Sequence, residues 1–181
     1  DLAFASDGTP YVSYHYNNGA LHSNGINVVW KSGSMWDGKR VDYRAWPGAE
    51  LGKFTALALS SADYPQVAYH DDSGFDQLFG WQDGSGWHTE SAYVAVFDVI
   101  GQYTDIALDA GDNIYLSTWF GTALGDDCVS LVSKVLGTWS KEDVDCDSGA
   151  DFGKYTGIDI DSQGHPHITY YAAGKLNYAV H

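Results

Sequence analysis

The sequence repeats itself at a regular interval. The tetrapeptide Gly52-Lys53-Phe54-Thr55 returns as Gly-Gln-Tyr-Thr at 101–104 and as Gly-Lys-Tyr-Thr at 153–156, and each copy opens a short segment of alternating polarity. The chain begins inside a fourth copy of this segment, so that successive copies are 55, 49 and 52 residues apart, counted from Leu2 to Leu57, Ile106 and Ile158. Self-similarity at such a period predicts a repeat architecture, in which each unit buries its apolar face against its neighbours.

Each period contains the same parts in the same order. The alternating segment is followed by a polar turn, a second and a third apolar segment, and a glycine-containing turn that leads into a Trp. The second segments are 10–15, 65–70, 114–119 and 166–171, the third are 27–31, 77–82, 128–135 and 175–180, and the aligned tryptophans are Trp36, Trp87 and Trp139. Short segments of alternating polarity bounded by turns are typical of β-strands. We expect the tryptophans to pack between neighbouring units.

Four short antiparallel strands in each unit of about 50 residues are typical of a propeller blade. The sequence therefore predicts an all-β fold, a single β-propeller over 1–181 with blades at about 1–51, 52–100, 101–152 and 153–181. The last blade is expected to lack its outer strand, and an unpaired sheet edge invites another chain to pair with it. Three interpretations stay open: a fragment of a larger propeller, a last strand supplied by a partner or a second copy, or a final blade of three strands.

Charge and hydropathy exclude two classes of partner. The chain carries 24 acidic and 9 basic side chains, for a formal net charge of −15. Nucleic acid is excluded because affinity for phosphates comes from Lys and Arg. The longest apolar stretch, 92–97, is far too short to span a bilayer, and we expect no membrane insertion.

The two cysteines stand at 128 and 146, in the expected third and fourth strands of the third blade. Folding that hairpin about 136–138 places Cys128 opposite Cys146, close enough for a disulfide. The alternative is a pair of buried thiols. Because cytosolic proteins seldom keep disulfides, the bridge predicts a secreted or cell-surface protein.

Several stretches carry a family resemblance. The run His-Pro-His-Ile-Thr-Tyr-Tyr at 165–171, the run Asp-Gly-Ser-Gly-Trp at 83–87 and the run Gly-Gln-Tyr-Thr-Asp-Ile-Ala-Leu-Asp at 101–109 resemble the repeats of bacterial extracellular β-propellers with BNR-like or sialidase-like blades. The run at 83–87 approaches the sialidase Asp box without reproducing it. The resemblance implies a propeller fold and says little about chemistry.

The candidate ligand site lies at the ends of the expected second strands. These ends align His15, His70, Trp119 and Tyr171, which are preceded by Tyr14, Tyr69 and Tyr170, with Thr118 as the exception. In a propeller such positions lead into loops on one rim, where aromatic faces stack on sugars and polar tips reach sugar hydroxyls. The structural alternative is that these residues fill space between blades.

The preferred functional hypothesis is a secreted or surface-displayed, non-catalytic binding or assembly module for glycans or a protein partner. One alternative is a polysaccharide lyase or hydrolase in which His70 acts as base with Tyr69 or Tyr14 as acid. The arginine triad of a sialidase cannot be assembled, because the chain has only Arg40 and Arg44. A second alternative is a self-assembling structural or filament subunit completed by strand exchange at the open blade edge.

A weaker signal is the acidic series Asp143, Asp145 and Asp147, followed by Asp151. Calcium prefers six to eight hard oxygen ligands, and this spacing resembles the start of a calcium loop. The standard loop fails at its last position, where Lys154 replaces Glu. On a strand, the same alternation makes a solvated face. We expect no other cofactor.

Overall fold

The computed structural model describes residues 1–19, 23–45, 50–148 and 152–181, and this part of the chain forms fifteen β-strands and no helix. The strands of the first two blades are β1 (Leu2–Phe4), β2 (Pro10–Asn18), β3 (Ser23–Ser32), β4 (Met35–Arg44), β5 (Leu51–Leu59), β6 (Pro65–Asp71), β7 (Asp76–Asp83) and β8 (Gly86–Tyr93). The strands of the last two are β9 (Val99–Leu108), β10 (Ile114–Gly121), β11 (Asp127–Val135), β12 (Thr138–Asp147), β13 (Lys154–Ile160), β14 (Pro166–Ala172) and β15 (Lys175–Val180). No helix among these residues is long and apolar enough to cross a membrane.

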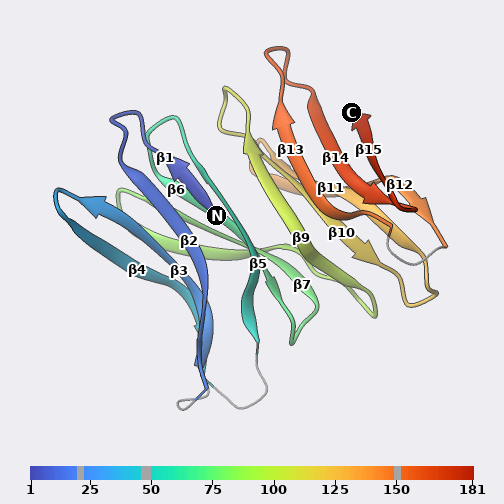
Figure 1. The fold of residues 1–181 in the computed structure, drawn as a ribbon, viewed down its shortest axis with the longest axis horizontal. Coiled ribbons are helices and arrows are strands. Elements are labelled where there is room, and N and C mark those ends of the chain that lie inside the picture. The colour runs from blue at the N-terminus through green and yellow to red at the C-terminus, as the bar shows by residue number, and fades with distance from the viewer. Residues whose placement is uncertain (20–22, 46–49, 149–151) are drawn as a thin grey trace.

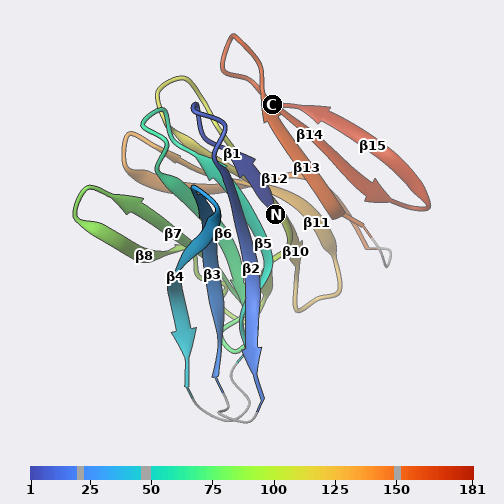
Figure 2. The ribbon, with the colours of Figure 1, turned by 60° about the vertical axis from the view of Figure 1, so that its left-hand side comes forward.

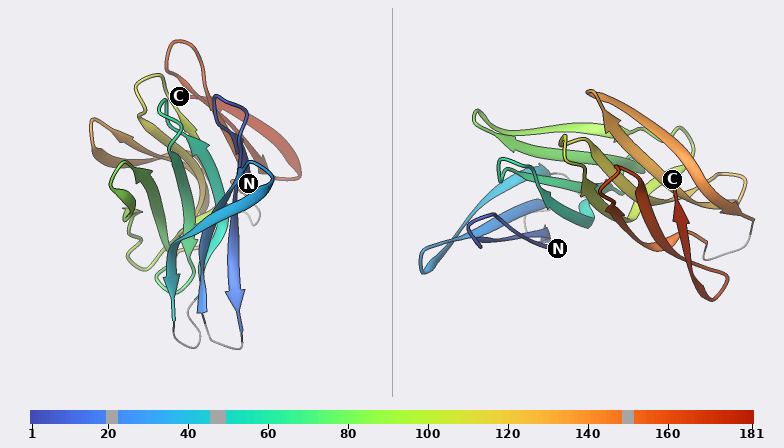
Figure 3. Two further views of the ribbon diagram at one scale, coloured as in Figure 1. Left: turned by 90° about the vertical axis from the view of Figure 1, so that its left-hand side faces the viewer. Right: turned by 90° about the horizontal axis from the view of Figure 1, so that it is seen from above.

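The strands form four antiparallel sheets in chain order: β1–β4, β5–β8, β9–β12 and the three-stranded β13–β15. The sheets follow one another as successive blades, with the blue first blade at the left and the red fourth blade at the right in Figure 1. Figure 2 shows the blue first blade in front, with the red fourth blade to its right. Seen from above, the same order is apparent (Figure 3). The predicted all-β propeller fold, including the three-stranded last blade, is confirmed.

The core lies between the blades. Three clusters of buried side chains join the first blade to the second, the second to the third and the third to the fourth. The second strands contribute Val67, Leu116 and Ile168, each with no exposed surface. Because alternate residues of a strand point to opposite faces, one face of the second, third and fourth blades packs against the blade before it.

Two of the three tryptophans take the predicted packing position. Trp87 packs against the cluster shared by the first two blades, and Trp139 against the cluster shared by the second and third. Trp36 is 56% exposed, so the prediction that it packs between blades is wrong for this residue. It lies on the face of the first blade that has no neighbouring sheet in this structure.

The repeated Gly-x-aromatic-Thr motif joins each inner strand to the blade before it. A Cβ on Gly52 would lie 2.5 Å from the carbonyl oxygen of Gly25, and one on Gly153 would lie 2.4 Å from that of Cys128. Both glycines also have positive φ, so the position requires glycine on two grounds. The threonine of the last copy, Thr156, donates to the carbonyl oxygen of Tyr103 at 2.6 Å and so ties the fourth blade to the third.

The predicted disulfide is confirmed: Cys128 and Cys146 are directly opposed and joined, with an S–S distance of 2.06 Å. The hairpin turns tightly, because Val135 already pairs with Thr138. A β-bulge at Val144 then shifts the register so that the cysteines meet. Equivalent bulges fall at positions 41 and 92 of the other outer strands, and each bulged side chain packs into the core.

Candidate functional site

The predicted site residues gather at one end of the blades. The register pairs Lys53 with His70, Gln102 with Trp119 and Lys154 with Tyr171. The ends of the second strands therefore lie beside the beginnings of the inner strands in three successive blades. We call this end of the molecule, from His15 in the first blade to Tyr171 in the fourth, the rim.

Two of the predicted tyrosines lie inside the protein rather than at the rim surface. Tyr69 is fully buried and donates its hydroxyl hydrogen to Asp42 at 2.9 Å. Tyr170 is also buried and donates to Asp145 at 2.5 Å. Burial raises the pKa of Tyr69, and the charge of Asp42 raises it further. Burial and the hydrogen bond to Asp145 raise the pKa of Tyr170 to about 12. Both act as contacts to the outer strand of the preceding blade.

Tyr14 occupies the same position in the first blade but is 41% exposed. Its hydroxyl accepts a hydrogen bond from the Asn27 side chain at 3.2 Å. Tyr14 faces the side of its sheet opposite to His15, because the two residues are adjacent on one strand. It is therefore accessible but does not converge with the histidine.

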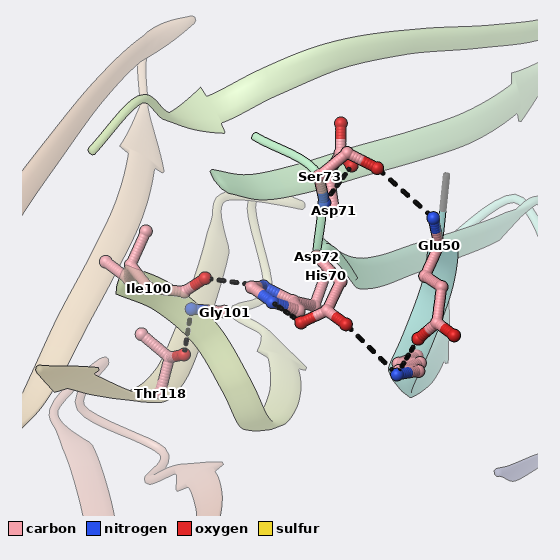
Figure 4. Close-up of polar contacts among 9 residues, drawn as sticks. Glu50, His70, Asp71, Asp72, Ser73, Ile100, Gly101 and Thr118 are labelled. Atoms are coloured by element: carbon pink, nitrogen blue, oxygen red, sulfur yellow. Dashed lines mark hydrogen bonds and ion pairs between the residues drawn. The ribbon is translucent and has the colours of Figure 1, made fainter. Parts of the chain in front are cut away.

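His70 is fully buried, and both of its ring nitrogens are occupied. Nδ1 lies 2.7 Å from the carbonyl oxygen of Ile100 and Nε2 lies 3.3 Å from the Asp72 carboxylate (Figure 4). The residue links the second blade to the third. The structure thus disfavours His70 as the catalytic base of the enzyme alternative.

His15 and Trp119 are partly buried and leave a polar atom free. Nε2 of His15 and Nε1 of Trp119 are both buried without a hydrogen-bond partner among the described residues. Burial, reinforced by the positive charge of Lys53, lowers the pKa of His15 below its usual range. The ring is therefore neutral at pH 7, and its Nε2 receives a hydrogen bond or a proton in the tautomer that carries the hydrogen on Nδ1.

Two charged side chains act on His15 at the junction of the first two blades: the charge of Lys53 lowers the pKa of its ring and that of Glu50 raises it. The Lys53 ammonium group contacts Glu50 and lies 3.1 Å from Asp72. The hydrogen bond to Glu50 raises the pKa of Lys53. Burial alone would raise the pKa of Asp72, but the hydrogen bond and charge of Lys53 outweigh it and lower that pKa. Asp72 is therefore ionised and Lys53 protonated at neutral pH.

The loop that carries Asp72 is held in place by its neighbours. Ser73 accepts a hydrogen bond from the Glu50 backbone at 3.1 Å, and its own backbone N–H donates to Asp71 at 3.0 Å (Figure 4). Arg44 of β4 pairs with Asp71 at 3.0 Å. We name His15, Glu50, Lys53 and Asp72 the charged cluster; Glu50 and Asp72 lie in loops, and nothing in the sequence pattern pointed to them.

A row of aromatic rings runs beside these residues and was not predicted. The rings of Phe54 and Tyr103 lie 4.9 Å apart and those of Tyr103 and Tyr155 lie 4.7 Å apart, measured between centroids. The row continues to His70 at 6.1 Å and to Tyr171 at 6.4 Å. We name Phe54, Tyr103 and Tyr155 the aromatic row. The signal was present in the sequence, because each ring is the third residue of the repeated tetrapeptide, where it served only to mark the period.

The structure does not gather the acidic series of the third blade into a calcium site. Asp143 accepts hydrogen bonds from Ser130 and Lys141, whereas Asp145 accepts one from Tyr170 of the next blade. Among the described residues, the one group of three metal-ligating side chains that includes Asp143 also contains Cys128 and Cys146, whose sulfur atoms form the disulfide. Asp147 is absent from that group, and Asp151 lies outside the described residues.

Comparison with known proteins gives matches in structure alone. No protein-family model and no curated protein matches the sequence. The structure is similar to the Hadza microbial sialidase Hz136, with a TM-score of 0.70 and 11% sequence identity over 99% of this chain and 42% of that chain. It is also similar to an endo-arabinase from Bacteroides thetaiotaomicron VPI-5482, with a TM-score of 0.58 and 12% identity over 99% of this chain and 72% of the arabinase.

A third match is the polysaccharide lyase Uly1, with a TM-score of 0.55 and 7% identity over 99% of this chain and 48% of the lyase. This chain therefore spans less than half the length of the sialidase and of the lyase. At such low identities the likeness concerns the fold. The chain has the fold of a β-propeller.

Proposed function

We propose that this propeller acts on polysaccharide and cleaves it by acid–base chemistry at the charged cluster. The observation that carries the proposal is the buried, unpartnered Nε2 of His15, on a neutral ring that senses the charges of Lys53 and Glu50, where Lys53 in turn pairs with the ionised Asp72. Titratable groups with shifted pKa values that lie close together are candidates for catalysis. The fold supports the same proposal, since a sialidase, an endo-arabinase and a polysaccharide lyase share it.

The roles follow from the protonation states. His15, neutral at pH 7, accepts a proton from the water molecule that attacks the anomeric carbon as the glycosidic bond breaks, and the leaving glycosidic oxygen takes its proton from solvent. Asp72, ionised, stabilises positive charge that develops on the sugar ring as the glycosidic bond breaks. Lys53 fixes the Asp72 carboxylate by the 3.1 Å contact and keeps it charged. His15, rather than the buried His70, is therefore the base.

The experiment is a measurement of reducing ends released from soluble polysaccharides. His15→Ala and Asp72→Asn should each lower kcat by about 100-fold or more. Glu142→Gln is the matched control, because that carboxylate lies on β12 and contacts His181, away from the cluster. Turnover that is unchanged in both cluster variants contradicts the proposal.

A second candidate function is non-catalytic glycan binding, which was the preferred hypothesis from sequence. It is favoured by the pairing of Glu50, Lys53 and Asp72 with one another, since side chains that satisfy one another form a stable surface without a reaction. Retained binding to a polysaccharide with no release of reducing ends would select it. A protein partner and self-association at the β15 edge stay predictions, which the mass in solution by light scattering tests.

The place of action that we propose is outside the cytoplasm. The Cys128–Cys146 disulfide supports it, because oxidising compartments preserve such bonds. The excess of acidic side chains favours solubility there.

A further inference from the structure

The aromatic row presents one ring from each of three blades. Phe54, Tyr103 and Tyr155 occupy the same position of the repeated motif on β5, β9 and β13. Consecutive rings lie within 5 Å of each other, at 4.9 and 4.7 Å. The row therefore runs from blade to blade, across the direction of the strands, and its length grows with the number of blades.

These rings are held in a conformation that bulky residues seldom adopt. Phe54, Tyr103 and Tyr155 have φ values of 51°, 53° and 53°. Left-handed backbone costs an L-residue roughly 1–2 kcal/mol, and strain of this kind clusters where side chains serve a function. The same strain at the same motif position in three blades places three aromatic side chains side by side.

The next residue of the motif keeps the strained segment in place. Thr104 donates to the Gln77 side chain of the preceding blade at 2.7 Å. Thr156 lies 2.9 Å from the Ser117 hydroxyl, and Thr55 makes the equivalent contact with Ser13. A binding surface that is rigid before the ligand arrives loses little entropy on binding.

The row is open to solvent toward the fourth blade. Tyr155 is 69% exposed, whereas Phe54 and Tyr103 are partly buried. Exposed aromatic rings with polar edges suit ligands that have one apolar face and hydroxyl groups around it, which is the chemistry of a sugar ring. An open row of rings fits successive units of a chain better than a single small molecule.

The charges decide which kind of glycan fits. Lys53, which precedes Phe54, is already paired with Glu50 and Asp72. The protein as a whole carries a net charge of −15, which repels polyanions at long range. The ligand expected at this surface is therefore an uncharged polysaccharide.

From these observations we infer that the aromatic row is the binding track for an extended, uncharged polysaccharide chain, which stacks on the exposed ring of Tyr155 and continues along the tilted rings of Tyr103 and Phe54. The inference rests on the proposed function, and it names the substrate class and the surface that holds the chain. The track leads past His70 toward the charged cluster, because Phe54 contacts the His70 ring at 6.1 Å and His70 in turn contacts Asp72.

Affinity gel electrophoresis with soluble polysaccharides tests the inference. The uncharged probes are arabinan, xylan and mixed-linkage β-glucan, and the anionic probes are hyaluronan and alginate. We expect retardation by at least one uncharged probe and none by the anionic ones. Tyr155→Leu and Tyr103→Leu should weaken binding about tenfold each, because leucine keeps an apolar side chain but removes the flat ring.

Matched variants separate stacking from folding. Tyr155→Phe keeps the ring and should bind as the wild type does, although it carries the same backbone strain as Tyr155→Leu. Tyr64→Leu removes a partly exposed ring from the turn at the other end of the blade and should have no effect. Circular dichroism checks that all variants fold.

Three results would overturn the inference. Preference for the anionic probes would contradict the charge argument. If no probe retards the wild type, the aromatic row is not a binding track. Wild-type binding that survives both leucine substitutions would show that the glycan lies elsewhere. In that last case the proposed function still stands if His15→Ala and Asp72→Asn abolish turnover. The opposite outcome is loss of binding in the leucine variants while the two cluster variants keep full turnover. It supports the track and refutes the proposed chemistry.

Discussion

Replacement of Gly153 by alanine is expected to loosen the junction between the third and fourth blades. A Cβ at this position would lie 2.4 Å from the carbonyl oxygen of Cys128, well inside the 3.0 Å that real Cβ atoms keep. Because the obstacle is backbone, β13 or β11 must move. Overpacking of this kind costs about 1–3 kcal/mol. The positive φ of 76° adds a separate conformational cost, which is roughly 1–2 kcal/mol for an L-residue.

Gly164→Ala separates the two costs. Gly164 also has a positive φ, 88°, but no heavy atom lies within 4 Å of the place that an added Cβ would occupy. Both substitutions restrict the unfolded chain equally, so the difference between them isolates the clash. Urea unfolding should give a midpoint for Gly153→Ala that lies roughly 1 M below that of Gly164→Ala. Equal midpoints would refute the claim that the motif glycine is required by close approach of the blades.

Two further predictions concern the disulfide and His15. The Cys128–Cys146 bond spans 18 residues, and closing a loop of that length stabilises the folded state by about 3 kcal/mol in the chain-entropy model. The variant with serine at both positions should therefore unfold at a lower urea concentration. An unchanged midpoint would contradict this prediction. Because folding lowers the pKa of His15, the unfolded chain binds the proton first as the pH falls below about 6.5, and stability is lost in that direction. His15→Gln should flatten this part of the stability profile between pH 7.5 and 5, and a profile identical to the wild type would exclude His15 as its origin.

The fold was predictable because the repeat period and the alternation of polarity act together. Turn residues at fixed offsets set the blade boundaries, and the alternation of polarity indicated strands with one apolar face, on which Val67, Leu116 and Ile168 are buried. The disulfide was predictable for a partly mistaken reason, since the tight turn after Val135 and the bulge at Val144 compensate each other. Bulges of this kind depend on packing between blades and leave no local signal.

The site was less predictable, for three physical reasons. Adjacent strand residues face opposite sides, so that Tyr69 and His70 were never able to share one surface. The charged cluster draws Glu50 and Asp72 from loops, whose positions depend on contacts between blades. The aromatic row depends on the positive φ angles of Phe54 and its equivalents. The identity of a single residue does not predict such an angle. Repetition of an aromatic residue two positions after a constrained glycine is the feature that would reveal such a row in another sequence.

The turns between the first and second strands show how polar pairs join neighbouring blades. Asp63 accepts hydrogen bonds from the backbone and hydroxyl of Ser6 in the preceding blade, at 2.9 and 2.5 Å. Asp112 does the same for Ser61, at 2.8 and 2.6 Å. The third junction lacks both partners, because the corresponding residues are alanine and glycine. The pair is therefore present or absent as a unit.

Ala110→Ser combined with Gly164→Asp should install the missing pair between the third and fourth blades. Aspartate suits the position, because Asp63 and Asp112 adopt φ values of 60° and 58° in the equivalent turns. A hydrogen-bonded pair at an exposed site contributes about 0.5–1.5 kcal/mol, and a double-mutant cycle in urea should assign that gain to the combination rather than to either change alone. Additive single effects would mean that the fourth blade does not sit against the third as the second and third sit against their predecessors, and the repeat geometry on which the aromatic row depends would fail with it.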